Sequence, residues 1–280
     1  MSVIGMLLIG LGFLFSRVYG NPVILYVVAA VSVGGNIIAF WHSDKIALAL
    51  SGARSVSRDE QVRLYRIVEN LCITAGLPMP RLFVIPGAQI NAFATGRDAR
   101  HAAIAVTDGA LDRLDDNELV GVLAHELSHI GNRDILLSTV VVVLAGVIAL
   151  LSDMFLHASM WGGRGHDDDR DRGGLVVIVA IIASLLAPLA ATLIQLAVSR
   201  KREFLADASG ALLTRYPEGL ASALEKIAGD GAPLRSAHTA TAHLFITNPL
   251  KGQRGMHWVS RLFMTHPPIE ERIRALRGER

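Results

Sequence analysis

The chain has 280 residues, a formal net charge of +2 at pH 7, and 51% hydrophobic but only 19% charged residues. With a mean hydropathy of +0.42, this composition is typical of a membrane protein rather than of an ordinary soluble domain. The small net charge and the lack of interleaved aromatic and basic residues argue against nucleic acid as a partner. The single cysteine, Cys72, cannot form an internal disulfide, and its apolar neighbours predict a buried structural thiol.

Four charge-free stretches predict membrane-spanning helices, since a helix needs about 20 apolar residues to cross a bilayer. They cover residues 1–16, 18–43, 135–152 and 173–199. The first is short and has an alternative interpretation as a signal peptide, but it lacks both a basic start and a cleavage site followed by soluble sequence. We therefore expect two hairpins of spans that alternate with two soluble parts. The resulting divisions are an N-terminal hairpin (1–41), the first part of a peptidase domain (42–134), a second hairpin (135–198) and the second part of that domain (199–280).

The orientation of these spans is predicted by the basic residues near their ends. The run 200–202 abuts the fourth span, and Lys45, Arg54 and Arg58 follow the second. The loop 164–172 between the last two spans also carries arginines, beside several aspartates, and we interpret it as a flexible polar connector. A metal site at His166 is its alternative. We expect a multi-pass protein of the cell (inner or plasma) membrane with both parts of the soluble domain in the cytoplasm.

The first soluble part is predicted to be a helix, three short strands and a second helix. Apolar residues recur at helical spacing over 57–75, and Gly76 and Pro78 end that helix. The strands are expected at 82–85, 90–94 and 103–106. The second helix begins at 115–118, where small acceptors and acids suit a helix start, and Gly131 offers its stop. The fold class is therefore mainly α with a small antiparallel β-sheet (α+β), plus four transmembrane helices.

The second helix carries the run His125-Glu126-Leu127-Ser128-His129. Histidines four residues apart project from one face of a helix, so that their rings can share one metal ion. Glu126 lies about 100° around the helix and suits a general base acting on water at that ion. Two imidazoles and a carboxylate are typical of zinc with one open coordination position, and we expect one Zn²⁺ per chain.

The third ligand is sought by elimination. A metzincin would carry glycine at 132 and histidine at 135, where this chain has Asn132 and Ile135. The next glutamate after Glu126 is Glu203, just past the fourth span and two spans away from His129, which places both on the same side of the membrane. Asp207 shares the helical face of Glu203 and is a candidate for orienting a ligand histidine.

Three motifs together give the chain a clear resemblance to the HtpX family of bacterial membrane proteases, which are relatives of the CAAX prenyl endopeptidase. They are the histidine run above, Arg202-Glu203-Phe204-Leu205-Ala206-Asp207, and Thr265-His266-Pro267-Pro268-Ile269-Glu270-Glu271-Arg272-Ile273. The resemblance implies a gluzincin-like zinc peptidase domain with Glu203 as the third zinc ligand. It implies a role for His266 as donor to the developing oxyanion, with a plain turn histidine as alternative. It also implies a structural role for Arg272, which could pair with Asp207.

The segment Asn91-Ala92-Phe93-Ala94 matches the same family. We predict an exposed edge strand there that binds substrate backbone as an added strand, with ordinary strand packing as the alternative. The family implies proteolysis of misfolded or damaged membrane proteins at the cytoplasmic face, with membrane proteins and the lipid bilayer as partners. A dedicated processing protease and a non-catalytic zinc-binding membrane scaffold are the alternatives. The sequence leaves the substrates and the oligomeric state open.

Overall fold

The structure is a computed structural model. It describes residues 20–136, 200–232 and 267–279, together with residues 9, 13, 16, 17, 234 and 244–247. The predicted third and fourth spans, the aspartate-rich loop between them and His266 thus lie outside the described residues, apart from the first two residues of the third span.

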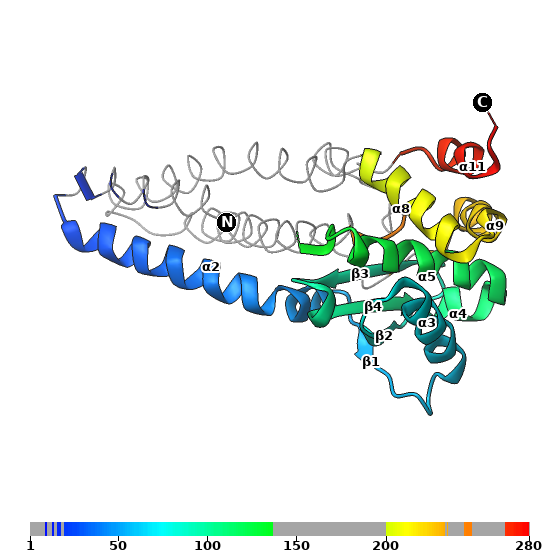
Figure 1. Cartoon of the computed structure of the whole chain (residues 1–280). Coiled ribbons are helices and arrows are strands. Elements are labelled where there is room, and N and C mark those ends of the chain that lie inside the picture. Colours follow the sequence, from blue (N-terminus) through cyan, green and yellow to red (C-terminus); the bar gives the residue numbers. More distant parts are fainter. Residues whose placement is uncertain are drawn as a thin grey trace, which may run out of the picture.

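The long helix α2 (Pro22–Leu50) extends away from the rest of the described structure (Figure 1). It begins at Pro22, because the side chain of Asn21 accepts a hydrogen bond from the Val23 N–H and Pro22 occupies the first turn. Residues 22–43 of the second predicted span lie within this helix. In the described part of the chain, no helix meets both the length and the apolar character that crossing a membrane requires.

Four strands form one mixed sheet in the order β1-β2-β4-β3. They are β1 (Arg54–Ser55), β2 (Arg81–Ile85), β3 (Ala92–Gly96) and β4 (Ala102–Thr107). The predicted antiparallel sheet is wrong at one pair, since β2 and β4 run parallel, with Leu82 opposite Ile104. The chain between these two strands holds β3 and a short 3-10 helix (Ala99–His101), and is long enough for the crossover that a parallel pair needs. β3 then pairs antiparallel with the far side of β4.

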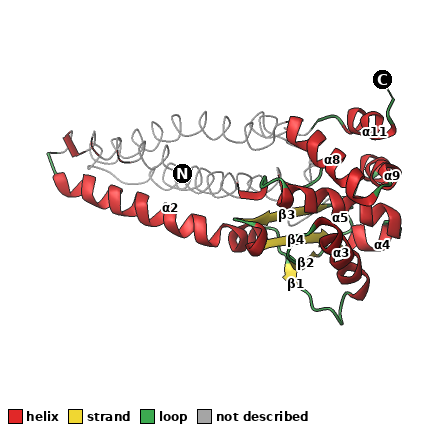
Figure 2. Cartoon of the chain, viewed as in Figure 1, coloured by secondary structure: helices red, strands yellow, loops and turns green. Residues whose placement is uncertain are grey.

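The sheet has an apolar core on each face. On one face, helices α3 (Val62–Ala75) and α5 (Asp116–Gly131) pack against alternate strand residues such as Leu82 and Ile104. On the other face, the C-terminal end of α2 and the segment 244–245 cover Phe93 and its neighbours. Figure 2 shows α5 above β3 and β4, with α3 beside the sheet. Cys72 is buried in the first core, as predicted.

The predicted helix at 57–75 begins later than expected, at Val62. The preceding residues form a turn in which the Glu60 carboxylate accepts hydrogen bonds from the N–H and the hydroxyl of Ser57. A serine and a carboxylate three residues apart thus bond to each other instead of starting the helix. The predicted end is confirmed, because Gly76 caps α3 in the left-handed conformation.

Helix α5 lies under the C-terminal helices α8 (Arg200–Thr214), α9 (Pro217–Gly229) and α11 (Ile269–Arg277). A short helix, α4 (Asp108–Arg113), precedes it. Two glycines set how closely these helices approach. A Cβ at Gly121 of α5 would lie 2.5 Å from the Leu220 nitrogen of α9, and one at Gly210 of α8 would lie 3.1 Å from the His125 nitrogen of α5. The second contact brings α8 directly against the histidine run.

Candidate metal centre

Helix α5 positions the histidine run because its start is firmly fixed. Asp115 accepts from the Glu118 N–H while the Glu118 side chain accepts from the Asp115 N–H, which is a complete capping box. The Glu118 carboxylate also binds Lys226 and Ser222 of α9. The motif follows in the buried half of the helix, where His125 is 1% and Glu126 2% exposed.

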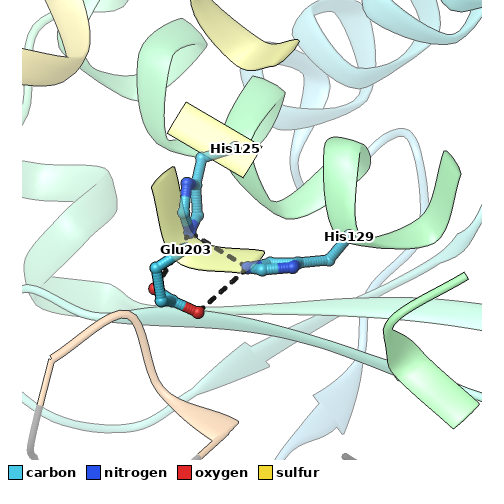
Figure 3. A group of neighbouring side chains, drawn as sticks. All are labelled: His125, His129 and Glu203. Atoms are coloured by element: carbon cyan, nitrogen blue, oxygen red, sulfur yellow. Dashed lines mark hydrogen bonds and ion pairs between the residues drawn. The ribbon is translucent and has the colours of Figure 1, made fainter. Parts of the chain in front are cut away.

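His125, His129 and Glu203 converge on one point, with a ligand atom of each within 4.8 Å of the others. The Nε2 atoms of the two histidines are 3.2 Å apart. One oxygen of Glu203 lies 3.6 Å from Nε2 of His129 and the other lies 3.9 Å from Nε2 of His125. Figure 3 shows the two rings and the carboxylate turned toward one another. Residues far apart in the sequence are therefore brought together as the elimination argument expects.

The other ring nitrogen of each histidine faces a carboxylate. Nδ1 of His125 lies 2.8 Å from Oδ1 of Asp207, and Nδ1 of His129 lies 3.1 Å from Oδ2 of Asp134. A carboxylate only accepts, so each Nδ1 carries a proton, which leaves each Nε2 facing the space between the rings as the atom that can bind a metal ion. This arrangement is common for histidines that bind metals.

Arg272 closes the site from helix α11. Its side chain is fully buried, and its Nε and one terminal nitrogen donate to the two oxygens of Asp207 at 2.8 and 2.7 Å. Another terminal nitrogen lies 3.6 Å from Glu203. Burial alone would raise the pKa of Asp207, but the charge and hydrogen bonds of Arg272, together with His125, hold it well below its usual range. The contact between Arg272 and Asp207 expected from the resemblance is thus present.

Glu126 lies beside the three converging residues, against strand β3. The backbone N–H of Ala94 donates to its carboxylate. Burial, assisted by the charge of Glu203, raises the pKa of Glu126 to about 7 against the opposing effects of His129, Ala94 and Arg272. A carboxylate with a pKa near neutrality is suited to accept and return a proton.

The two histidines differ in pKa. Burial, with the nearby charges of Arg272 and His129, lowers the pKa of His125 against the opposing effect of Asp207. Burial also disfavours a charged His129, but its hydrogen bond to Asp134 and the carboxylates of Glu203 and Glu126 together raise its pKa to about 9. Positive charge at this point is therefore favoured by the surrounding acids.

These residues fit a zinc ion. Two imidazole nitrogens bound to one tetrahedral zinc at about 2.0–2.1 Å would lie about 3.3–3.4 Å apart, close to the 3.2 Å between the two Nε2 atoms. The carboxylate of Glu203 supplies a third donor of the preferred type, and acidic residues around the site offset the charge of a cation. Three protein donors are typical of catalytic rather than structural zinc sites.

The segment Asn91-Ala92-Phe93-Ala94 is not the exposed strand that we predicted. β3 does lie at the sheet edge, but all four residues are buried, at 6% exposure or less. The outward backbone groups of Ala92 are already engaged, because its carbonyl accepts from Ile246 and its N–H donates to the Asn91 side chain. Asn91 also donates to the carbonyl of Thr247. The alternative prediction, ordinary strand packing, therefore describes Asn91 and Ala92.

Asp134 is a site residue that sequence reasoning missed, since it lies just before the charge-free stretch 135–152 and was given no role. The sequence does hold one signal for this role, because Asp134 lies just after the predicted end of the helix at Gly131. A turn at that point can direct a side chain back to the last turn of the helix.

The match to known proteins agrees with this geometry. Residues 58–280 match the model of peptidase family M48. The chain belongs to peptidase family M48. A protein named "Protease HtpX homolog" from Tropheryma whipplei (strain TW08/27) is 48% identical over 270 residues, which is 96% of this chain and 89% of the relative. Another of that name, from Pyrococcus furiosus, is 48% identical over 273 residues, or 97% and 90% of the two chains.

A solved structure supports the fold of this M48 peptidase. Ste24p of S. mikatae superposes with a TM-score of 0.51 at 19% sequence identity, covering 98% of this chain. The chain spans 63% of the length of that protein. The M48 assignment makes the chain a metallopeptidase, so the resemblance to HtpX proteases noted in the sequence is confirmed.

Proposed function

We propose that this M48 peptidase is a membrane-embedded, zinc-dependent endopeptidase that hydrolyses misfolded or damaged membrane proteins at the cytoplasmic face. One zinc per chain would be held by His125, His129 and Glu203. The observation that carries the proposal is the convergence of these three residues, with both Nδ1 atoms held by carboxylates so that both Nε2 atoms face the same space.

When bound, zinc supplies a Lewis acid that polarises the scissile carbonyl and makes water acidic. Glu126 accepts the proton of the attacking water and returns it to the leaving amine, and its pKa near 7 suits both steps. The Ala94 amide keeps the Glu126 carboxylate aimed across the site. His266 is proposed to donate to the developing oxyanion.

Substrate is proposed to bind as an extended strand along the outer edge of β3. Since the outward groups of Ala92 are engaged by Asn91 and Ile246 and the Ala94 N–H donates to Glu126, pairing would fall beyond Ala94, still next to Glu126. An extended peptide held there would have its backbone beside the general base. Folded proteins do not offer such a backbone, which favours unfolded segments.

The membrane setting is supported by the predicted spans on either side of the site. Five residues separate His129 from the third predicted span, and three separate Glu203 from the fourth. At about 1.5 Å per helical residue, the ligands would lie within roughly 5–10 Å of the span ends. The site would then face loops and unfolded segments near the membrane rather than distant soluble proteins.

The variant Glu126→Gln tests the chemistry, because an amide cannot accept the proton of water. The purified full-length variant should retain zinc and its thermal unfolding temperature but lose about a thousand-fold or more of its cleavage rate. The substrate is a single-span model protein in vesicles with one cleavable sequence near the membrane. Moving this sequence far from the membrane, or enclosing it in a folded domain, should sharply reduce cleavage by the unmodified enzyme.

The same experiment separates the alternatives. Substantial residual cleavage by Glu126→Gln would contradict the role of that residue, and a cellular function that survives the substitution would favour a scaffold. Cleavage of one native protein with no activity on the model substrate would favour a dedicated processing protease.

A further inference from the structure

The second histidine of the motif is held by a residue outside the predicted metal-site set. Oδ2 of Asp134 lies 3.1 Å from Nδ1 of His129, and their side chains are only 11% and 16% exposed. Asp134 therefore stands to His129 as Asp207 stands to His125. The difference is that Asp207 is also bound by Arg272, whereas Asp134 lies in the turn that ends α5.

The backbone of that turn fixes where Asp134 can point. Arg133 adopts the left-handed conformation with φ of 63°, which is unusual for a residue other than glycine. The Arg133 N–H then donates to the carbonyl of Ile130, and the Asp134 N–H donates to that of His129 at 2.9 Å. This is the Schellman pattern of helix ends. Asp134 is thus bound to His129 twice, once through the backbone and once through the side chain.

The other oxygen of Asp134 faces the opposite side of the site. Oδ1 lies 3.9 Å from Nε of Arg202, the residue immediately before Glu203. That Nε and one terminal nitrogen of Arg202 are buried and make no hydrogen bond to any residue in the described ranges. The negative charge of Asp134 therefore offsets the positive charge of the partly buried Arg202 at the start of α8. One carboxylate contacts both the helix of His129 and the helix of Glu203.

We propose that Asp134 is a positioning residue of the metal site, which fixes the ring of His129 and the spacing between His129 and Glu203. The inference rests on the proposed zinc peptidase function. Without the carboxylate, the His129 ring could rotate or exchange tautomers, and Arg202 would lose a counter-charge beside the third ligand. We therefore expect the loss of this carboxylate to lower the metal affinity, since outer hydrogen-bond partners of ligand histidines typically contribute roughly 10–100-fold to it.

The test measures the zinc dissociation constant of the purified full-length protein by competition with a chromogenic chelator. Asp134→Ala should weaken zinc binding roughly 10–100-fold. Asp134→Asn should weaken it less, because the amide oxygen still accepts from Nδ1–H but carries no charge. Asp112→Ala is the matched control: Asp112 is an exposed carboxylate of the neighbouring helix α4, and its removal should leave the constant unchanged.

A second measurement separates positioning from general stability. The unfolding temperature of the metal-free protein should be nearly the same for Asp134→Asn and the unmodified chain, while their zinc affinities differ. In a double-mutant cycle, Arg202→Gln combined with Asp134→Ala should weaken zinc binding by less than the product of the two single effects, since both act through one contact. Additive effects would overturn the proposed link between the two helices.

The outcomes distinguish this inference from the proposed function. If the unmodified chain binds one zinc and loses it in Glu203→Ala, yet Asp134→Ala binds within about two-fold of the unmodified chain, only the role of Asp134 is wrong. Loss of affinity matched by an equal fall in metal-free stability would assign Asp134 a structural role instead. If the unmodified chain binds no zinc, the proposed function fails and this inference fails with it.

Discussion

His125 and His129 lie on one helix, whereas Glu203 and Arg272 reach the same point from two helices further along the chain. The histidine side is local: helical spacing aligns the two rings, and a turn at the end of the same helix supplies Asp134. The other side depends on tertiary packing, since Asp207 needs Arg272 from α11 as its partner. One half of this site is therefore encoded by local spacing and the other by burial and charge pairing.

The sharpest way to test this division is to remove the ligand contributed by packing. Glu203→Ala should reduce zinc content from about one per chain to near zero, because two histidines alone leave the ion without its third protein donor. Metal analysis of the purified protein measures the loss. Asp207→Asn, which keeps the shape of its side chain, should retain more zinc. The reverse ranking would show that Asp207 rather than Glu203 is the third ligand.

Removing the distant partner should affect folding more than any change on the histidine side. Arg272→Ala leaves the buried Asp207 carboxylate without its counter-charge, which typically costs about 3–5 kcal/mol. The free energy of unfolding in urea, measured on the metal-free protein, reports this cost. Arg274→Ala, on the exposed side of the same helix, is the control and should change it little. Equal effects of the two changes would contradict a special role for the buried pair.

The contacts that α5 makes with α9 and with α8 can be compared in the same way. Gly121→Ala places a methyl group against the Leu220 backbone of α9, and Gly210→Ala places one against the backbone of His125. Each should destabilise the fold by about 1–3 kcal/mol, through the strain of overpacking. Only Gly210→Ala should also weaken zinc binding, because it displaces α8 beside the first histidine. Urea unfolding and chelator competition, measured on both variants, would show whether both contacts affect stability and only the contact of α8 affects zinc binding.

The smallest expected effect concerns the turn on the histidine side. Arg133→Gly should stabilise the fold by up to about 1 kcal/mol, since glycine adopts a φ of 63° without the penalty that arginine incurs. Urea unfolding measures the gain. Arg133→Ala, which removes the charge but keeps a Cβ, is the control and should show no such gain. A gain shared by both variants would mean that charge, and not backbone strain, is what matters at this position.

Much of the local structure could be predicted from the sequence. The capped start of α5, its end at Gly131 and the end of α3 at Gly76 follow from short-range rules that hold whatever the tertiary fold is. The pairing of strands could not be predicted in the same way, because strand positions do not reveal that β4 lies between β2 and β3.

The same division holds for the candidate site. The histidine run has a spacing that suggests a shared ion, and Glu203 could be reached by elimination. Asp134 was missed because its orientation depends on the left-handed backbone conformation of Arg133. A glycine at that position would have indicated such a turn, but an arginine does not. The burial of Asn91 to Ala94 was missed because it depends on α5 and on the segment 244–247, which cover the strand from outside the local sequence.

The position of Arg272 along the chain has a consequence for synthesis. A ribosome releases the chain from its N-terminus, so His125, Glu126, Glu203 and Asp207 all emerge before the arginine that balances their buried charge. At about 5–20 residues per second, several seconds pass between the completion of α8 and the arrival of α11. Throughout that interval the nascent chain holds an acidic cluster without its guanidinium. A peptidase built in this order gains its complete centre only after α11 has been made, so a prematurely terminated product that lacks α11 should be inactive.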